Sequence, residues 1–317
     1  MSQPKVITLS PDALDRNGIS TTETLLATRL DFLINGALST GYDRNGICAA
    51  QTTSGATALA LNGALGTTFN ERRGVYVLIY AAGADNTDVV FNVVGLDQNK
   101  NRITEAITGP DNGLIVLGST KFHYIVSITP DGAIDGNVEV GVNGYAQFAT
   151  PQHVAQYSAG DDTGDTYIVH GFDRNLRAVT DSITGVSGGT STTQDQNFEW
   201  VDRIASSGAS AGAVESGTDG KCESGWYVLN YRGPSSFNVG IGCTSGGATY
   251  AMQHTFTNVL ASGFVENDAV VLTHATITSK TASFEGNYTS PPAATRLAIT
   301  TAGTGPVTAT IIHAGKS

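Results

Sequence analysis

An all-β fold is the expectation for this chain: tandem duplicated β-sandwich-like units followed by a C-terminal, jelly-roll-like β-sandwich. Three observations support it. Charged residues make up 14% of the 317 residues and 38 are glycine, a composition typical of many short strands joined by tight turns. Runs that alternate between apolar and polar residues are separated by polar turns. The chain also repeats itself at a fixed spacing, which indicates repeated structural units.

The longer repeat spans the middle of the chain. Gly95-Leu96-Asp97 recurs 76 positions later as Gly171-Phe172-Asp173, and Phe122 recurs at the same spacing as Phe198. Because the matched stretch aligns without a gap, we expect two copies of one β unit. Phe122 and Phe198 should then occupy equivalent positions in the two cores.

A shorter duplication lies upstream and defines two arm segments. Asp15-Arg16-Asn17-Gly18-Ile19 recurs as Asp43-Arg44-Asn45-Gly46-Ile47, and Asn35-Gly36-Ala37-Leu38 recurs as Asn62-Gly63-Ala64-Leu65. Each arm segment is expected to supply a strand to one of the two β units, because an open unit would expose strand edges. The expected organisation is residues 1–75 as the duplicated arm segments, 76–147 as β unit 1, 148–222 as β unit 2, and 223–317 as a C-terminal sandwich.

Local patterns place the elements in order. Ser20 and Glu23, ahead of Leu25-Leu26, have the spacing of a capping box, which predicts a short helix near residues 21–30 followed by a strand. Both arm copies end in Asn-Gly, a dipeptide typical of hairpin turns. In the β units, strands are expected at 75–80, 89–95, 102–108, 122–128, 138–142, 166–170, 178–184, 198–204 and, more weakly, 213–216. In the C-terminal part, strands are expected at 226–231, 250–256, 270–274, 295–300 and 307–313.

The pattern changes after the second repeat, and residues 235–317 are expected to form an independent sandwich. Strands 295–300 and 307–313 alternate well enough for a hairpin, which the rest of the module must cover. This sandwich is expected to contribute to homo-oligomerisation or to display on a particle surface.

Charge and composition exclude several classes of protein. The net charge is −11 and no basic cluster is present, which disfavours nucleic acid as the main partner. No apolar run is long enough to span a bilayer and the N-terminal residues carry no secretory signal, so we expect synthesis and assembly in a cytoplasm. Cys48, Cys222 and Cys243 are too widely spaced for a disulfide framework or a metal site, and we expect them to be buried, reduced residues.

Two groups of side chains could bind a metal: Asp161, Asp162 and Asp165 in one loop, and His254, His274 and His313 in the C-terminal part. The acidic loop lacks the spacing of an EF-hand and is more typical of a solvated hairpin turn. Each histidine falls on or at the end of an expected strand, where packing is the commoner role. The sequence has no nucleophile elbow, phosphate-binding loop or zinc-protease motif, while a pair of distant carboxylates for glycoside hydrolysis stays open. We therefore predict no catalytic, cofactor-binding or metal residue, and no enzyme.

Several stretches resemble sequences common in the virion proteins of tailed bacteriophages. They are Phe91–Pro110, Ile47–Thr52 with Asn62–Leu65, and the C-terminal segments Gln253–Phe256, Gly286–Tyr288, Ala294–Leu297 and Val307–Thr310. The resemblance covers most of the chain and rests on turns, strands and a few fixed words. It implies a structural component of the phage head or of the head–tail region, and it transfers no active-site residue.

The function expected from these observations is a non-enzymatic virion structural protein, a capsid decoration or cement protein that stabilises the shell. The expected partners are the major capsid protein or other virion proteins and further copies of the chain, without nucleic acid, membrane or cofactor. One alternative is a head–tail adaptor, tail or fibre-attachment protein. Another is a carbohydrate-binding or glycan-degrading module for host attachment, which would need an exposed aromatic cluster. Trp200 and Trp226 lie in strand-like runs, which favours core packing over a sugar platform.

Overall fold

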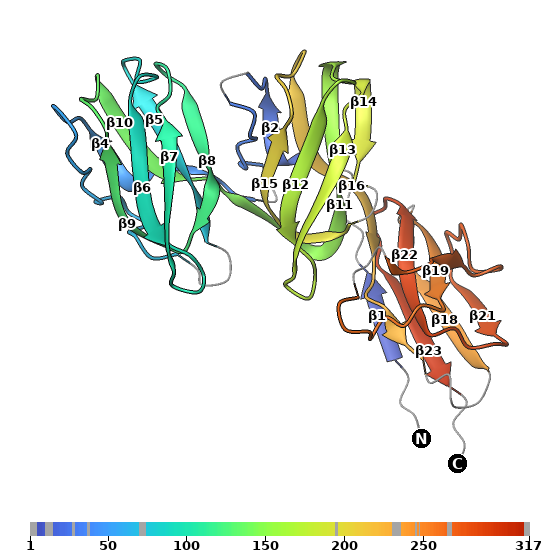
Figure 1. The fold of residues 1–317 in the computed structure, drawn as a ribbon. Coiled ribbons are helices and arrows are strands. Elements are labelled where there is room, and N and C mark those ends of the chain that lie inside the picture. The colour runs from blue at the N-terminus through green and yellow to red at the C-terminus, as the bar shows by residue number, and fades with distance from the viewer. Residues whose placement is uncertain are drawn as a thin grey trace.

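The computed structural model describes residues 5–9, 15–26, 29–36, 39–69, 74–193, 196–229, 236–244, 246, 248–264 and 268–313. Within these residues the long elements are all β-strands, which confirms the all-β fold. The strands build three β-sandwiches in a row, here called sandwich 1, sandwich 2 and sandwich 3, with sandwich 2 in the middle (Figure 1). No helix in the described part of the chain is long and apolar enough to cross a membrane.

Sandwich 1 is built from one continuous stretch of chain. Its larger sheet has the strand order β4-β10-β5-β8 and its smaller sheet the order β7-β6-β9, with antiparallel neighbours throughout. The strands are β4 (Asp43–Gln51), β5 (Val75–Ala82), β6 (Val90–Leu96), β7 (Arg102–Thr108), β8 (Ile115–Phe122), β9 (Tyr124–Pro130) and β10 (Asn137–Val142).

Sandwich 2 has the same plan, but its strands come from two separate parts of the chain. The orders are β2-β16-β11-β14 and β13-β12-β15. The strands are β2 (Asp15–Glu23), β3 (Ser39–Thr40), β11 (Tyr145–Asp161), β12 (Thr166–Phe172), β13 (Ala178–Thr184), β14 (Ser187–Thr192), β15 (Phe198–Ser206) and β16 (Val214–Glu223).

Sandwich 3 is the expected C-terminal sandwich, and its strand order is again that of sandwich 1. The orders are β1-β23-β18-β21 and β20-β19-β22. The strands are β1 (Lys5–Leu9), β17 (Tyr227–Val228), β18 (Phe237–Cys243), β19 (Thr249–Thr255), β20 (Leu272–Thr273), β21 (Phe284–Tyr288), β22 (Ala294–Thr301) and β23 (Val307–His313). The change of sequence pattern after the second repeat is therefore not a change of topology.

The two repeats share their strand register position by position. In β6 the register shifts against β9 between Val94 and Gly95, and in β12 it shifts against β15 between His170 and Gly171, 76 positions later. A Cβ atom at either glycine would overlap a carbonyl oxygen of the neighbouring strand and contact the ring of Phe122 or Phe198 respectively. Both rings are fully buried, as predicted. The repeated glycine thus allows a bulged strand to lie against a core aromatic ring.

The two arm segments each supply a strand, as predicted, and they do so in crossed order. The first arm provides β2 to sandwich 2, where it pairs with β16, and the second provides β4 to sandwich 1, where it pairs with β10. The two pairings have the same register: Ser20 faces Ser216 as Cys48 faces Val140. The N-terminal β1 closes sandwich 3 by pairing with β23.

The helix expected near residues 21–30 is wrong for the described residues of that stretch. Residues up to Glu23 belong to β2, and the rest have no regular structure. Ser20 Oγ does donate to Glu23 Oε1 (2.6 Å), but the same carboxylate accepts the backbone N–H of Leu33 (3.2 Å) and pairs with Arg29 (2.7 Å). Ser20 and Glu23, which resemble a capping box, therefore hold together an arm segment whose backbone pairs with β16.

Each sandwich has its own hydrophobic core. The core of sandwich 2 includes Phe32 and Ile34 from the first arm, and the core of sandwich 3 includes Leu9 and Leu229. Residues 235–317 alone therefore lack part of the core of sandwich 3. This corrects the expectation that this stretch is an independent sandwich.

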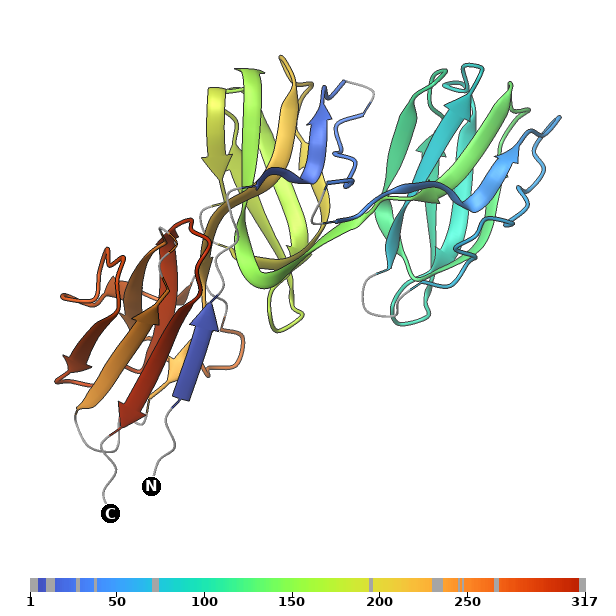
Figure 2. The same cartoon turned by 180° about the vertical axis from the view of Figure 1, so that it is seen from behind.

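The chain runs out along the row and back, so it crosses each joint between sandwiches twice. Between sandwiches 1 and 2 the two crossings lie side by side, with Thr40 paired to Tyr145 and Ser39 to Ala146 (Figure 2). The long strand β16 continues from sandwich 2 into sandwich 3, where Cys222 faces Ile299 of β22. Strand β11 begins in the joint, where Ala146 faces Val201 of β15, and continues into the larger sheet of sandwich 2. The three bodies are thus joined by strands rather than by single linkers.

Candidate functional site

In the acidic loop, the carboxylates of Asp161 and Asp162 accept hydrogen bonds from other groups of the same chain. Asp162 is almost fully buried, with Oδ1 accepting the N–H of Ala211 (2.6 Å) and Oδ2 accepting the hydroxyl of Ser158. Asp161 Oδ1 accepts the hydroxyl of Thr163 (2.8 Å). Within the described residues, no three His, Cys, Asp or Glu side chains are placed to hold a metal ion. This arrangement is that of a hydrogen-bonded turn.

Two of the three C-terminal histidines meet around one tyrosine ring. His254 and His274 lie edge-on to Tyr288, with ring centroids 5.3 and 4.4 Å away. Nδ1 of His274 accepts the backbone N–H of Thr276 and of Ile277 (both 3.2 Å), so its Nε2 carries the hydrogen and donates to the Asn287 carbonyl (3.1 Å).

Their contacts with Tyr288 make His254 and His274 packing residues of sandwich 3. Burial, and secondarily the neighbouring His274, lower the pKa of His254, which favours its neutral form. The side chain of His313 lies outside the described residues.

The tryptophans and cysteines offer no shared site. Trp200 is 8% exposed and packs near Tyr145 (5.5 Å), while Trp226 lies beneath the guanidinium of Arg296 (4.6 Å). The three cysteines form no disulfide, and two of them, Cys48 and Cys222, are buried. Burial raises the pKa of Cys48 to about 12, which leaves that thiol protonated and unreactive at neutral pH.

The two arm segments instead place a repeated arginine in the same kind of site in sandwiches 1 and 2. In sandwich 1 the guanidinium of Arg44 lies over the ring of Tyr80 (4.1 Å) and pairs with Glu139. In sandwich 2 the matching arginine, Arg16, lies over Tyr157 (4.9 Å) and pairs with Glu215 (3.2 Å). Arginine combines both contacts because its planar cation can stack on a ring and bind a carboxylate.

The repeated Asn-Gly pairs cover the outer edges of the arm strands rather than closing two-residue hairpins. Asn35 Oδ1 accepts the N–H of Thr21 and Asn62 Oδ1 accepts the N–H of Ala49, both at 2.9 Å. The following glycines donate their N–H groups back to the same two strands. The sequence shows the repeated Asn-Gly pairs but not their role, because their hydrogen-bond partners lie elsewhere in the chain.

The joint between sandwiches 1 and 2 buries a lysine–aspartate pair. Lys121 at the end of β8 pairs with Asp202 on β15, and its ammonium lies 5.2 Å from the ring centre of Tyr76 and 4.9 Å from that of Phe172. Burial raises the pKa of Asp202 even though Lys121 acts to lower it. Each sandwich thus supplies one charge and one ring to the joint.

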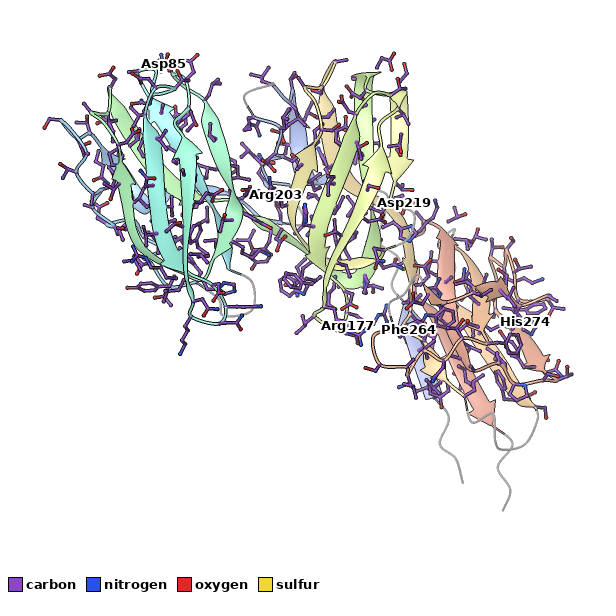
Figure 3. The ribbon with its side chains drawn as sticks, viewed as in Figure 1. Asp85, Arg177, Arg203, Asp219, Phe264 and His274 are labelled. Carbon is purple, nitrogen blue, oxygen red and sulfur yellow. The ribbon has the colours of Figure 1, made fainter. Side chains whose placement is uncertain are left out.

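A second ion pair lies beside the first. Arg203 Nε donates to Asp31 Oδ1 (2.6 Å), and its guanidinium lies 5.3 Å from the ring of Tyr76 (Figure 3). The Asp31 carboxylate raises the pKa of Arg203 although burial opposes it. Tyr76 of sandwich 1 therefore lies near both cations of the joint.

The joint between sandwiches 2 and 3 uses backbone carbonyls as acceptors. Arg174 Nη2 donates to the carbonyl of Glu223 (2.7 Å). Arg177 Nη1 donates to the carbonyl of Phe264 (2.5 Å), and these two residues lie next to each other in Figure 3. A groove of about 460 Å³ lies beside this joint, lined by residues 5–9 and 149–151, Arg174 and residues 224–227.

Comparison with known proteins identifies no relative. No protein-family model and no curated protein matches the chain. Among solved structures, tripeptidyl peptidase 2 is similar at a TM-score of 0.17 and 9% identity, over 96% of this chain and 24% of that one. This chain therefore spans about a quarter of the length of that protein. A likeness this weak carries no argument about fold or function.

Proposed function

We propose that the chain is a non-enzymatic structural protein of a tailed-bacteriophage virion, and specifically a capsid decoration or cement protein that stabilises the shell. The observation that carries the proposal is the doubled connection between sandwiches. Two antiparallel crossings and the Lys121–Asp202 ion pair fix sandwich 1 against sandwich 2. A row built in this way keeps its length, as an element that ties neighbouring subunits of a shell must.

The use of three buried acidic side chains supports the same role. Asp202, Asp162 and Glu139 hold, respectively, a joint, a turn and an arm. These interactions join parts of the chain to one another. The sequence resemblance to virion proteins is the reason for proposing a phage particle as the assembly in which such an element would serve.

Copy number and position in purified particles test the proposal. Quantitative mass spectrometry combined with a symmetry-resolved particle map should find roughly sixty or more copies on the shell. About six or twelve copies at one vertex would instead assign the chain to the head–tail region, tail or fibre attachment. Absence of the chain from purified particles would refute a virion role.

A further inference from the structure

One of the three arm strands lacks the cover that its counterparts have. In sandwich 1, Gly63 donates its N–H to Ile47 of β4 (2.8 Å), and in sandwich 2, Gly36 donates to Ile19 of β2 (2.9 Å). A later part of each arm thus covers the outer edge of its own strand. In sandwich 3 the equivalent strand is β1, which within the described residues pairs with β23 alone. The outer edge of β1 therefore presents a row of backbone donors and acceptors.

The groove beside the second joint follows this edge, because all five residues of β1 line it. In sandwich 2 the corresponding region holds the returning arm, whose Phe32 and Ile34 are fully buried in the core. In sandwich 3 the segment 224–229 takes the place of Phe32 beside the smaller sheet, with Tyr227 paired to Thr295 and Leu229 in the core. No hydrogen bond from described backbone reaches the outer edge of β1, and the groove of about 460 Å³ is lined by β1 and residues 224–227 of that segment. An extended segment lying in it would repeat what the arms do in the other two sandwiches.

The lining of the groove indicates the chemistry of the occupant. Among the described residues that line it, the ionisable side chains are those of Lys5 and Arg174, both cationic, together with the phenol of Tyr227, and none is Asp or Glu. Trp226 adds a second aromatic ring, and Val6 on the strand is 55% exposed. This is a local reversal of sign in a chain of net charge −11. A strand added here would direct alternate side chains toward the groove, where acidic groups would meet the two cations.

We propose that the β1 edge of sandwich 3 is a docking site for an extended, acidic segment of a partner protein, which adds a strand to the sheet β1-β23-β18-β21. Backbone pairing with β1 supplies affinity, and Lys5 and Arg174 select acidic residues. The inference does not rest on the proposed function, because it needs only the open edge and its groove.

The first test uses full-length chain and a synthetic probe. The probe is an end-blocked peptide of about eight alternating Glu and Val residues, the length of an ordinary strand. Hydrogen exchange should show the outward-facing amides of β1, those that do not bond to β23, unprotected in the free chain and protected when the peptide is bound. A peptide with Lys in place of Glu, and one with alternate backbone nitrogens methylated, should bind at least about tenfold more weakly, since each removes charge attraction or strand pairing.

Charge-reversal variants locate the site. Lys5→Glu should weaken binding of the acidic peptide by about three- to tenfold, the range for exposed charge pairs, and the binding should weaken as salt is raised. Lys280→Glu is the matched control: Lys5 lies over the ring of Tyr227 (6.0 Å) and Lys280 over that of Phe284 (4.2 Å), but Lys280 is not among the residues that line the groove. Thermal melting confirms that both variants are folded.

Four outcomes overturn the proposal. They are outward-facing amides of β1 already protected in dilute free chain, equal binding of the Lys and Glu peptides, unchanged binding by Lys5→Glu, and protection of those amides that depends on chain concentration without peptide. The first would mean that the chain covers its own edge, and the last that a second copy is the occupant.

Discussion

Replacing Lys121 by Met should loosen the joint between sandwiches 1 and 2 by removing the charge that neutralises Asp202. Methionine keeps most of the side-chain length and its contacts with the rings of Tyr76 and Phe172. What is lost is a charge-assisted hydrogen bond, and the Asp202 carboxylate is left buried without its cation.

The magnitude follows from burial. Breaking a buried ion pair costs about 3–5 kcal/mol, and a charge-assisted hydrogen bond contributes about 1.5–3 kcal/mol. The Asp202 side chain is 11% exposed but that of Lys121 is 25% exposed, so water can partly compensate the lost charge. We expect a loss of about 2 kcal/mol at neutral pH, with the double variant Lys121→Met with Asp202→Asn recovering part of it.

The loss should depend on pH with a defined sign. Burial raises the pKa of Asp202, and Lys121 is the largest influence that lowers it, so the pKa rises further in the variant. For an acid with a raised pKa in the folded state, the protonated form favours folding. That stabilisation is present below the unfolded pKa and is lost as pH rises through the folded one. The deficit of Lys121→Met should therefore shrink as pH falls from neutral toward the pKa of Asp202.

Hydrogen exchange measured in urea can follow sandwiches 1 and 2 separately in the variant and in Lys100→Met, a control at an exposed turn lysine of sandwich 1. The reasoning is refuted if Lys121→Met costs no more than the control, or if its deficit grows as the pH falls.

Four further predictions follow from the packing. Phe198→Ala should destabilise sandwich 2 by about 3–5 kcal/mol and leave the transition of sandwich 1 in place, with Phe122→Ala doing the reverse in calorimetry. Deleting residues 1–40 should expose the edge of β16 and cause aggregation or loss of assembly; a truncated chain that melts and assembles normally would contradict this. A chelator should leave the melting temperature unchanged, and a fall of many degrees would reveal a structural metal. The fragment 43–142 should give a cooperative melt because it holds every strand of sandwich 1, whereas 235–317, which lacks β1, should not.

The sequence predicted those parts of the fold that local patterns encode. Alternation placed most strands, and the constant spacing between Gly95 and Gly171 reflects a bulge that only glycine allows beside a core ring. The helix prediction failed because Ser20 and Glu23 form a local pattern, while pairing of β2 with β16 is a contact between residues far apart in the chain. Such contacts override local preference when they close a sheet.

The joints and the strand order of sandwich 3 could not be predicted for a related reason. Lys121 and Asp202 are 81 residues apart, and neither belongs to a motif. Sandwich 3 has the strand order of the other two without the side chains that mark the repeats, and β18 has exposed glycines such as Gly240. Strand order depends on backbone pairing, which can be the same in sequences whose side chains differ.

The routing of the chain sets the order in which the sandwiches can close. Every strand of sandwich 1 lies within residues 43–142, whereas sandwich 2 needs β2 to meet β16, and sandwich 3 needs Lys5 to meet Ile311. Each doubling of loop length adds only about 0.6 kcal/mol to the entropy of closure, so these long loops cost little stability, but they slow closure. β1 and β2 both dock at sheet edges, where the other strands can form without them. We therefore expect β1 and β2 to join their sheets after the remaining strands have formed, and sandwich 3, which contains the first and the last described strand, to close last.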